Sequence, residues 1–403
     1  MRVMDRGEFW GTHAPEVDAL QREWAEYIGT KHALVTNSGT AALHIAVAAA
    51  GVGPGDEVIT SALTFVASAH AIMQQNAVPV FADIDPRTYN IDPAGVGARI
   101  TERTRAIIPV HLHGMPADMD EINAVAAQHG LLVIEDACQA HGATYKGRKA
   151  GALGDMAAFS LNGSKNLPGG EGGLFNTTSD ELKRRADLVR VLGEDIQPGV
   201  ERDYNAFAIG WMYRYQEMAA AFVRTRLGTL DLENEQRCRN AEYLSKALRE
   251  LPGIIPPHVP PDRTSVYHLF RIRFDPAALG LSVHPKEFRA KVQKALRAEG
   301  VQANRWQNRL VPMQAVFQKR EGYGKGCPWD CPHGNTPRQA YRLEDYPETK
   351  KLVDDSIVMH SALYPPNGRD LLDRYIAAFQ KLWENMDEVI RVSFEPDEIY
   401  IRD

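Results

Sequence analysis

Residues 131–136 read Leu-Leu-Val-Ile-Glu-Asp, four apolar residues followed directly by two carboxylates. An apolar run of this length is typical of a strand that is buried on both faces of a parallel sheet. Ligands of open α/β sheets bind outside the carboxyl ends of the strands, which is where Asp136 would lie. The sequence therefore predicts a strand that carries Asp136 to a ligand site, although an Asp after a strand also often caps the next helix.

Similar apolar runs lie on both sides of this one, with helical patterns between them. The predicted strands cover residues 33–35, 57–59, 78–81, 106–110, 131–134 and 157–160, and two of the predicted helices cover residues 40–50 and 119–129. Strands that alternate with helices in this way are typical of a mostly parallel sheet wrapped by helices. We therefore expect an α/β domain.

A second, smaller domain is predicted after residue 250. Leucines at helical spacing predict one long helix over residues 217–250, which would bridge the two domains. Beyond a Pro-rich stretch, the remaining predicted elements are a strand and two helices, over residues 266–274, 285–299 and 371–386. We expect a large domain over residues 1–250 and a small C-terminal α/β domain over residues 251–403.

The composition argues against several classes of protein. With 403 residues, 44% of them hydrophobic and 24% charged, the chain is typical of a globular protein. Lys and Arg number 46 against 52 Asp and Glu, so a formal charge of -6 offers no overall attraction to nucleic acid or to an anionic membrane. No apolar run is long enough for a membrane span, and residues 1–10 carry charges instead of the apolar core of a signal peptide. We expect a cytoplasmic protein without nucleic-acid or membrane partners.

The few cysteines fit a reducing compartment. Cys327 and Cys331, followed by His333, could offer two thiolates and an imidazole to zinc, but no second pair of Cys or His stands at a matching distance. We therefore interpret this segment as a Pro-rich surface loop and predict no metal site.

Two further segments each follow a predicted strand and carry groups that suit a cofactor. Residues 37–44 read Asn-Ser-Gly-Thr-Ala-Ala-Leu-His, whose N–H groups and hydroxyls could hold a phosphate, although a simple helix N-cap explains them equally well. Residues 159–173 read Phe-Ser-Leu-Asn-Gly-Ser-Lys-Asn-Leu-Pro-Gly-Gly-Glu-Gly-Gly, so Lys165 lies among small residues where a solvated surface charge is a poor explanation. Lysine forms the Schiff base of pyridoxal phosphate (PLP) enzymes, and a carboxylate keeps the pyridinium nitrogen protonated. The three segments together predict a PLP site that contains Lys165 and Asp136.

The same segments resemble the DegT/DnrJ/EryC1/StrS aminotransferases, the sugar and cyclitol aminotransferases of PLP fold type I. The resemblance runs over most of the chain. The motifs that carry it are Asn-Ser-Gly-Thr-Ala-Ala-Leu (37–43), Gly-Pro-Gly-Asp-Glu-Val-Ile (53–59), Pro-Val-His-Leu-His-Gly (109–114), Ala-Asp-Met-Asp (117–120), Glu-Asp-Ala (135–137), Gln-Ala-His-Gly (139–142) and residues 160–173. The resemblance implies a mostly parallel seven-stranded sheet in the large domain.

It also implies a role for individual residues. Lys165 would form the Schiff base and then move a proton between the substrate carbon and the cofactor, while Asp136 would pair with the pyridine nitrogen. The other cofactor contacts would be Gln139 at the phenolic oxygen, Phe65 stacked on the ring, and Gly39, Thr40 and Ser160 at the phosphate. A core Phe is the alternative interpretation of Phe65.

The chain departs from the family pattern at one point. Members usually have Asn in a Gly-x-Asn-Tyr-Arg stretch that reaches the phosphate of the neighbouring subunit, whereas this chain reads Gly-Trp-Met-Tyr-Arg over residues 210–214. Met212 cannot donate a strong hydrogen bond, so Arg214 is the remaining candidate for that contact. The resemblance thus implies a homodimer with composite sites, whose interface would include residues 204–217.

The predicted reaction is transfer of an amino group from glutamate or glutamine to a keto-sugar or keto-cyclitol. The alternatives are a PLP-dependent dehydratase or aromatising lyase of the same family, and a PLP-binding regulator without catalysis. Members with His in place of the Schiff-base lysine are dehydratases, and this chain keeps Lys165. Aromatic and polar residues that could line the substrate cleft are Tyr204, Trp211, His268, Arg305, Trp306 and Gln307, although such residues more often serve packing or the surface.

Overall fold

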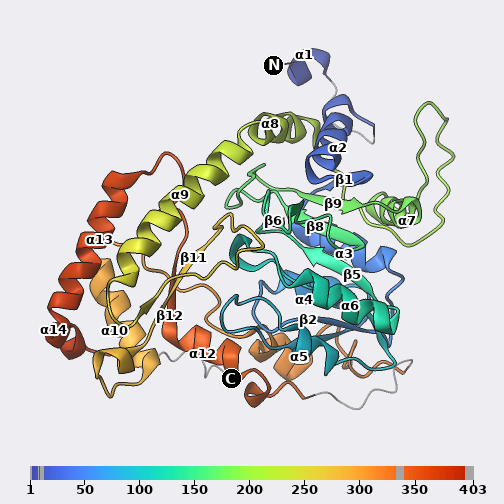
Figure 1. The fold of residues 1–403 in the computed structure, drawn as a ribbon. Helices are drawn as coiled ribbons and strands as arrows, with labels where there is room; N and C mark the ends of the chain where they lie inside the picture. Colours follow the sequence, from blue (N-terminus) through green and yellow to red (C-terminus); the bar gives the residue numbers. More distant parts are fainter. Residues whose placement is uncertain (1, 8, 10–12, 333–339, 395–403) are drawn as a thin grey trace.

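A seven-stranded sheet forms the centre of the larger lobe in the computed structural model, which describes residues 2–7, 9, 13–332 and 340–394 (Figure 1). From edge to edge its strands are β1 (His32–Thr36), β9 (Gly173–Thr177), β8 (Met156–Ser160), β5 (Leu132–Asp136), β4 (Thr104–Ile108), β2 (Glu57–Ser61) and β3 (Val78–Ala82). Only β9 runs antiparallel, to both β1 and β8. The predicted mostly parallel sheet of seven strands is therefore confirmed.

The strand β9 was absent from the strands predicted by hydrophobic pattern. Its sequence, Gly-Leu-Phe-Asn-Thr, contains Gly and Asn, two residue types that are depleted in strands. In the structure Asn176 is buried and accepts a hydrogen bond from the indole of Trp24 at 2.8 Å, so a tertiary contact satisfies its side chain. The pattern of a single segment does not reveal such a partner.

Helices cover both faces of the sheet, because each strand carries apolar side chains on both sides. One face packs against α3 (Gly39–Ala49), α4 (Ala67–Met73) and α7 (Asp180–Arg190). The other face packs against α2 (Pro15–Ile28), α5 (Pro93–Gly97), α6 (Met119–His129) and α8 (Glu217–Leu227). The short helix α1 (Arg2–Arg6) lies beside α8, and β6 (Thr144–Tyr145) and β7 (Arg148–Lys149) form a small hairpin. This is the layered α/β arrangement that the sequence predicts.

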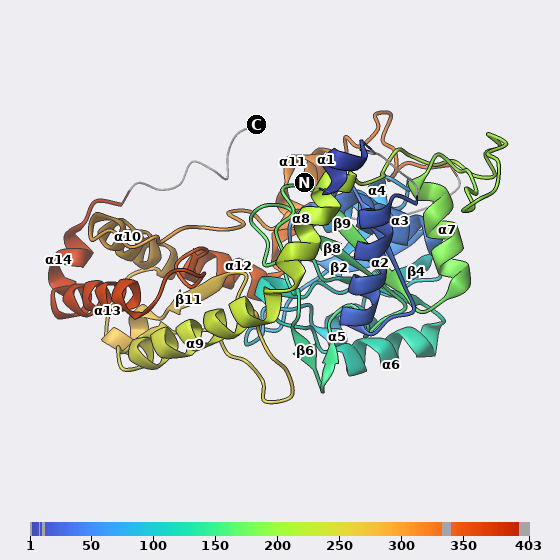
Figure 2. The ribbon, with the colours of Figure 1, turned by 90° about the horizontal axis from the view of Figure 1, so that it is seen from above.

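A second lobe contains a three-stranded antiparallel sheet, seen on the left in Figure 2. Its strands are β10 (Ile254–Ile255), β11 (Phe270–Phe274) and β12 (Ser356–Met359). Helices α9 (Leu230–Arg249), α10 (Pro285–Ala298), α13 (Arg369–Glu384) and α14 (Met386–Arg391) share its apolar core, while α11 (Ala315–Lys319) and α12 (Pro347–Asp355) lie nearer the large sheet. The division of the chain at residues 250 and 251 stays a prediction.

Two of the predicted elements have different bounds in the structure. The single helix predicted over residues 217–250 is wrong: α8 ends at Leu227, Gly228 and Thr229 intervene, and α9 begins at Leu230. Glycine in a helix interior costs stability, so a break at Gly228 is inexpensive. The strand predicted over residues 266–274 forms only from Phe270, because the Val266 amide donates instead to the Gly114 carbonyl of the large lobe. No helix in the described part of the chain is long and apolar enough to cross a membrane.

Glu217 joins the start of α8 to the start of α2. Its buried carboxylate accepts hydrogen bonds from the backbone amides of Glu16 at 2.8 Å and Val17 at 3.0 Å, and from Arg6 at 2.9 Å. The first amides of a helix have no partner within the helix and carry its positive dipole end, so an acceptor there is stabilising.

We expect Glu217→Ala to lower the free energy of unfolding by about 2 kcal/mol or more, because buried amides of α2 and Arg6 lose their shared acceptor. The measurement is chemical denaturation followed by circular dichroism. Glu235→Ala is the matched control: Glu235 forms an exposed i,i+4 pair with Arg239 on α9, and such pairs contribute well under about 1 kcal/mol. Equal losses of unfolding free energy in the two variants would show that the Glu217 carboxylate does not stabilise the contact between α8 and α2.

Candidate active site

A cavity of about 510 Å³ lies at the carboxyl ends of β5 and β8 and at the start of α3. It collects seven of the eight residues predicted to bind the cofactor: Gly39, Thr40, Phe65, Asp136, Gln139, Ser160 and Lys165. Arg214, the eighth, is not among the residues that line it. Parallel strands end at the same edge of a sheet, and this places segments distant in sequence around one cavity.

The start of α3 forms the part of the cavity that suits an anion. Ser38 caps the helix, with its side chain accepting from the Ala41 amide at 3.0 Å, so the N-cap interpretation holds for this residue. The amides of Gly39 and Thr40 stand in the first turn, where no partner exists within the helix. A Cβ on Gly39 would lie 2.7 Å from the Cβ of Ser160, so only glycine lets α3 approach β8 this closely. The capping Ser and the first-turn amides are therefore compatible with a bound phosphate.

The two carboxylates at the end of β5 have different environments, because successive side chains of a strand point to opposite faces. Glu135 is fully buried and accepts hydrogen bonds from the backbone amides of Gly151, Leu153 and Gly154, each at 2.7 Å. It also contacts His111 Nε2 at 2.8 Å. The Ala117 amide donates to His111 Nδ1, so the ring proton lies on Nε2 and is donated to Glu135. Glu135 thus has a structural position, a role that the sequence analysis, which singled out Asp136, did not predict.

Asp136 lines the cavity, and its carboxylate is held in place from two sides. Ser68 Oγ donates to Oδ2 at 2.7 Å, and the Cys138 amide donates to Oδ1 at 3.2 Å. Ser68 in turn contacts Thr64 Oγ1 at 2.9 Å, next to Phe65. Phe65 itself is 56% exposed, which excludes the alternative of a core Phe.

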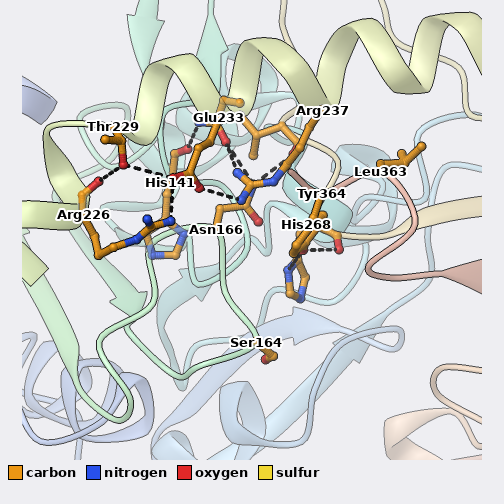
Figure 3. A network of polar contacts seen from close by, with 12 residues as sticks. His141, Ser164, Asn166, Arg226, Thr229, Glu233, Arg237, His268, Leu363 and Tyr364 are labelled. Carbon is orange, nitrogen blue, oxygen red and sulfur yellow. Dashed lines mark hydrogen bonds and ion pairs between the residues drawn. The ribbon is translucent and has the colours of Figure 1, made fainter. Parts of the chain in front are cut away.

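Lys165 is held in the cavity through its two neighbours in the chain. The Ser164 carbonyl accepts from His360 Nε2 at 3.1 Å, and the Asn166 side chain donates to Asn234 at 3.2 Å and to the Val266 carbonyl at 2.9 Å. Figure 3 shows Ser164 and Asn166 below α9, on the same side of the helix as Arg237 and Tyr364. Burial lowers the pKa of the Lys165 amine from its usual value, while Cys138 and Asp136 oppose that shift. A desolvated amine of lowered pKa is a better nucleophile than a solvated surface lysine.

Gln139 uses one polar atom of its side-chain amide within the protein and leaves the other available to a ligand. Its Oε1 accepts from the His113 amide at 2.9 Å, and no described residue accepts from its Nε2. The side chain is buried and lines the cavity, so its Nε2 can donate to an oxygen of a bound molecule.

The residues present fit the cofactor that the resemblance implies. A half-buried amine, a buried carboxylate, a helix start opened by Gly39 and an uncovered aromatic ring surround a single cavity. These groups match the aldehyde, the pyridine nitrogen, the phosphate and the ring face of PLP, respectively.

The candidates for substrate selection divide into two groups. His268, Arg305 and Trp306 line the cavity, whereas Tyr204, Trp211 and Gln307 do not. Trp211 instead packs on His44 of α3, with ring centroids 4.6 Å apart. His360 also lines the cavity, and no sequence pattern predicted it, because it follows β12 and lies 195 positions from Lys165 without a recognisable motif.

The segment between α7 and α8 extends away from the sheet as a long arm, green at the upper right of Figure 1. Bridges between Val191 and Met212 and between Glu194 and Ala206 join its two sides. The Met212 carbonyl accepts from Asn37 at 3.2 Å, while its side chain is exposed. The arm thus brings Met212 next to the predicted phosphate segment, although Arg214 stays outside the cavity of its own chain.

Cys327 and Cys331 lie in a loop, and the His333 considered with them lies outside the described residues. Within the part of the chain that the structure describes, no group of three His, Cys, Asp or Glu side chains is arranged to hold a metal ion.

Known proteins are similar to this chain over most of its length. The model of the DegT/DnrJ/EryC1/StrS aminotransferase family matches residues 2–348. A pleiotropic regulatory protein of Geobacillus stearothermophilus is 40% identical over 85% of this chain and 87% of its own. GDP-perosamine synthase of Caulobacter vibrioides is 42% identical over 70% of this chain and 74% of its own. L-glutamine:2-deoxy-scyllo-inosose aminotransferase of Streptoalloteichus tenebrarius is 43% identical over 69% of this chain and 66% of its own.

A solved structure shares the fold closely. The crystal structure of S. venezuelae DesV in complex with a ketimine intermediate superposes with a TM-score of 0.81 and 34% identity, over 95% of this chain and 92% of that one.

The neighbouring carboxylates allow a matched test of the site. We expect Asp136→Asn to keep the fold but lower turnover about a hundredfold or more, because a neutral amide does not keep a pyridine nitrogen protonated. We expect Glu135→Gln to lower the free energy of unfolding by about 2 kcal/mol or more, because an amide NH2 would face buried N–H donors. Single-turnover kinetics and thermal unfolding of both variants separate the two effects. Near wild-type turnover of Asp136→Asn would assign the role to another residue.

Proposed function

Because the chain belongs to the DegT/DnrJ/EryC1/StrS family of PLP-dependent aminotransferases, we propose that it moves an amino group from glutamate or glutamine to a ketone of a sugar or cyclitol. The observation that carries this proposal is the convergence of Lys165, Asp136 and the start of α3 on one cavity. The names of two relatives support the substrate class, since one makes a nucleotide-linked amino sugar and the other aminates a cyclitol with glutamine as the donor.

Each of the predicted cofactor residues in the cavity would have a separate role in the reaction. PLP, when bound, supplies an electron sink that lowers the barrier to breaking a bond at the substrate carbon. Lys165 would hold the cofactor and move the proton, since its amine is desolvated and lies inside the cavity. Asp136 would keep the pyridine nitrogen protonated, with Ser68 and the Cys138 amide fixing its orientation. Gly39, Thr40 and Ser160 would bind the phosphate, Gln139 the phenolic oxygen, and Phe65 the ring face.

We also propose a homodimer in the cytoplasm. The arm between α7 and α8, with the first turns of α8, carries exposed apolar side chains, among them Tyr204, Phe207, Ile209, Met218 and Phe222. Exposed apolar groups that gather on one segment favour a protein interface. A neighbour seated there would bring its Arg214 toward the phosphate end of the cavity, as the family pattern implies.

The two half-reactions provide the central test. Incubation of the PLP-loaded protein with glutamate or with glutamine should convert the spectrum to that of pyridoxamine phosphate, and a panel of keto-sugars and keto-cyclitols should then restore the original spectrum. Borohydride should fix the cofactor on the peptide that contains Lys165, and Lys165→Ala should abolish both conversions. Keto-acid formation that depends on an acceptor separates a transferase from a dehydratase or lyase. If neither amino acid changes the spectrum, the transferase proposal is wrong.

Composite sites predict complementation between two impaired variants. Arg214→Ala should weaken retention of PLP, because a guanidinium–phosphate contact is a charge-assisted pair. Heterodimers of Lys165→Ala and Arg214→Ala chains should regain activity, since one of their sites then carries both lesions and the other carries none. Tandem-tagged heterodimers can be isolated and assayed beside each parent. Heterodimers no more active than the parents, or a fully active monomer on sedimentation, would contradict the composite site.

A further inference from the structure

His268 is a buried residue of the cavity wall that the proposed chemistry does not yet use. It lies two residues before β11 and lines the same cavity as Lys165. Figure 3 shows its ring directed away from α9, below Tyr364. Its position therefore faces whatever binds beside Lys165.

Contacts with Tyr364 determine which ring nitrogen of His268 carries the proton. The Tyr364 hydroxyl donates its single proton to the His268 carbonyl at 2.8 Å. The same hydroxyl lies 3.2 Å from His268 Nδ1, so it can only accept there and Nδ1 must be the donor. In a neutral ring Nε2 then has a free lone pair. Within the described part of the chain, no residue donates to Nε2. This atom is not enclosed by protein, and the cavity is the open space that His268 lines, so Nε2 reaches the cavity.

The Tyr364 ring is itself held in place. The Arg237 guanidinium stacks on it at 4.4 Å from the centroid and donates to Asn234 at 2.7 Å. Asn234 also accepts from Asn166, the neighbour of Lys165. These contacts, part of which Figure 3 shows, link Asn166, the neighbour of Lys165, to His268 through Asn234 and Arg237 of α9.

The charge of the ring decides between a base and a hydrogen-bond acceptor. Burial lowers the pKa of His268 well below its usual value, and Lys165, His360, His113 and His141 act in the same direction. A ring of such low pKa stays neutral at neutral pH and is a weak general base, since efficient bases have a pKa near the working pH. It remains a good acceptor of a hydrogen bond.

We propose that His268 Nε2 accepts a hydrogen bond from a hydroxyl group of the amino acceptor and so selects polyhydroxylated acceptors over deoxy analogues. This inference rests on the proposed transferase function. A bare ring nitrogen needs a donor, and the carboxylates of glutamate and of its keto acid offer only lone pairs; the carboxamide of glutamine can donate, so the half-reactions below are compared with glutamate as the amino donor. A hydroxyl of a keto-sugar or keto-cyclitol provides the proton. A site that contains such an acceptor rejects analogues without the hydroxyl, because its buried nitrogen is then left unpaired.

The first experiment reads the ring directly and needs no acceptor. The holoenzyme is labelled with 15N-histidine, and long-range 1H–15N correlations report the tautomer, with His268→Asn identifying the resonances. We expect a neutral ring protonated at Nδ1 at neutral pH, and loss of this preference in Tyr364→Phe. A ring protonated at Nε2, or a charged ring, would overturn the inference.

The second experiment compares the two half-reactions. Asn can replace the Nδ1 donor of His268 but places nothing at Nε2, whereas Gln places an amide near Nε2. We expect His268→Asn to slow the acceptor half-reaction about tenfold more than the donor half-reaction, and His268→Gln to restore part of the difference. The preference for the acceptor over one of its monodeoxy analogues should also fall in His268→Asn. His129→Asn, an exposed position at the end of α6, is the control.

The outcomes separate the two proposals. If wild-type protein shows no donor half-reaction, the proposed function fails regardless of His268. If both half-reactions proceed and His268→Asn keeps the wild-type preference against every monodeoxy analogue, the role of His268 is wrong.

Discussion

The buried carboxylate of Glu135 accepts hydrogen bonds from His111 and from three amides of residues 151–154 at the end of β5. This carboxylate fixes the end of β5 against the loop that follows β4 and against the turn that leads into β8. Asp136 is the next residue along β5 and Gln139 follows three positions later, so both cavity residues leave the sheet directly after this contact. A buried charge is tolerated there because its lone pairs are satisfied.

The position of the loop that carries Lys165 also depends on contacts with residues that follow α8 in the chain. Ser164 and Asn166 are held by His360, Asn234 and the Val266 carbonyl, all of which come from residues after α8. A hinge motion between the lobes would therefore act on the loop of Lys165 directly. The break between α8 and α9 has a consequence here, since it lets α9 turn toward the small sheet while α8 stays on the large one.

Small residues and polar contacts bring these segments together. Gly39 allows α3 to approach β8, and a Cβ on Gly173 would lie 2.3 Å from the Ser38 carbonyl oxygen, so the phosphate segment touches β9 as well. His141, below the site, is fully buried against Trp24 and Phe159, and burial with nearby Lys165 lowers its pKa to about 3. His141 is therefore a neutral ring that packs in the core, and it does not serve as a second general base.

The sequence by itself predicted most strands of the large sheet, and a site that contains Lys165 and Asp136, because each of these depends on a local pattern: an apolar run, a helix start, or a strand end with a polar residue. The resemblance to a known family added Gly39, Thr40, Phe65, Gln139 and Ser160, which the structure places around the same cavity. Only the tertiary structure shows that Glu135 has a structural position, since this depends on the face of the sheet that its side chain meets and on the amides of residues 151–154. It also decided the strand β9, the break at Gly228, the exclusion of Trp211 from the cavity, and the entry of His268 and His360 into it. These features depend on contacts between segments up to about two hundred residues apart, and no periodicity within one segment records such a contact.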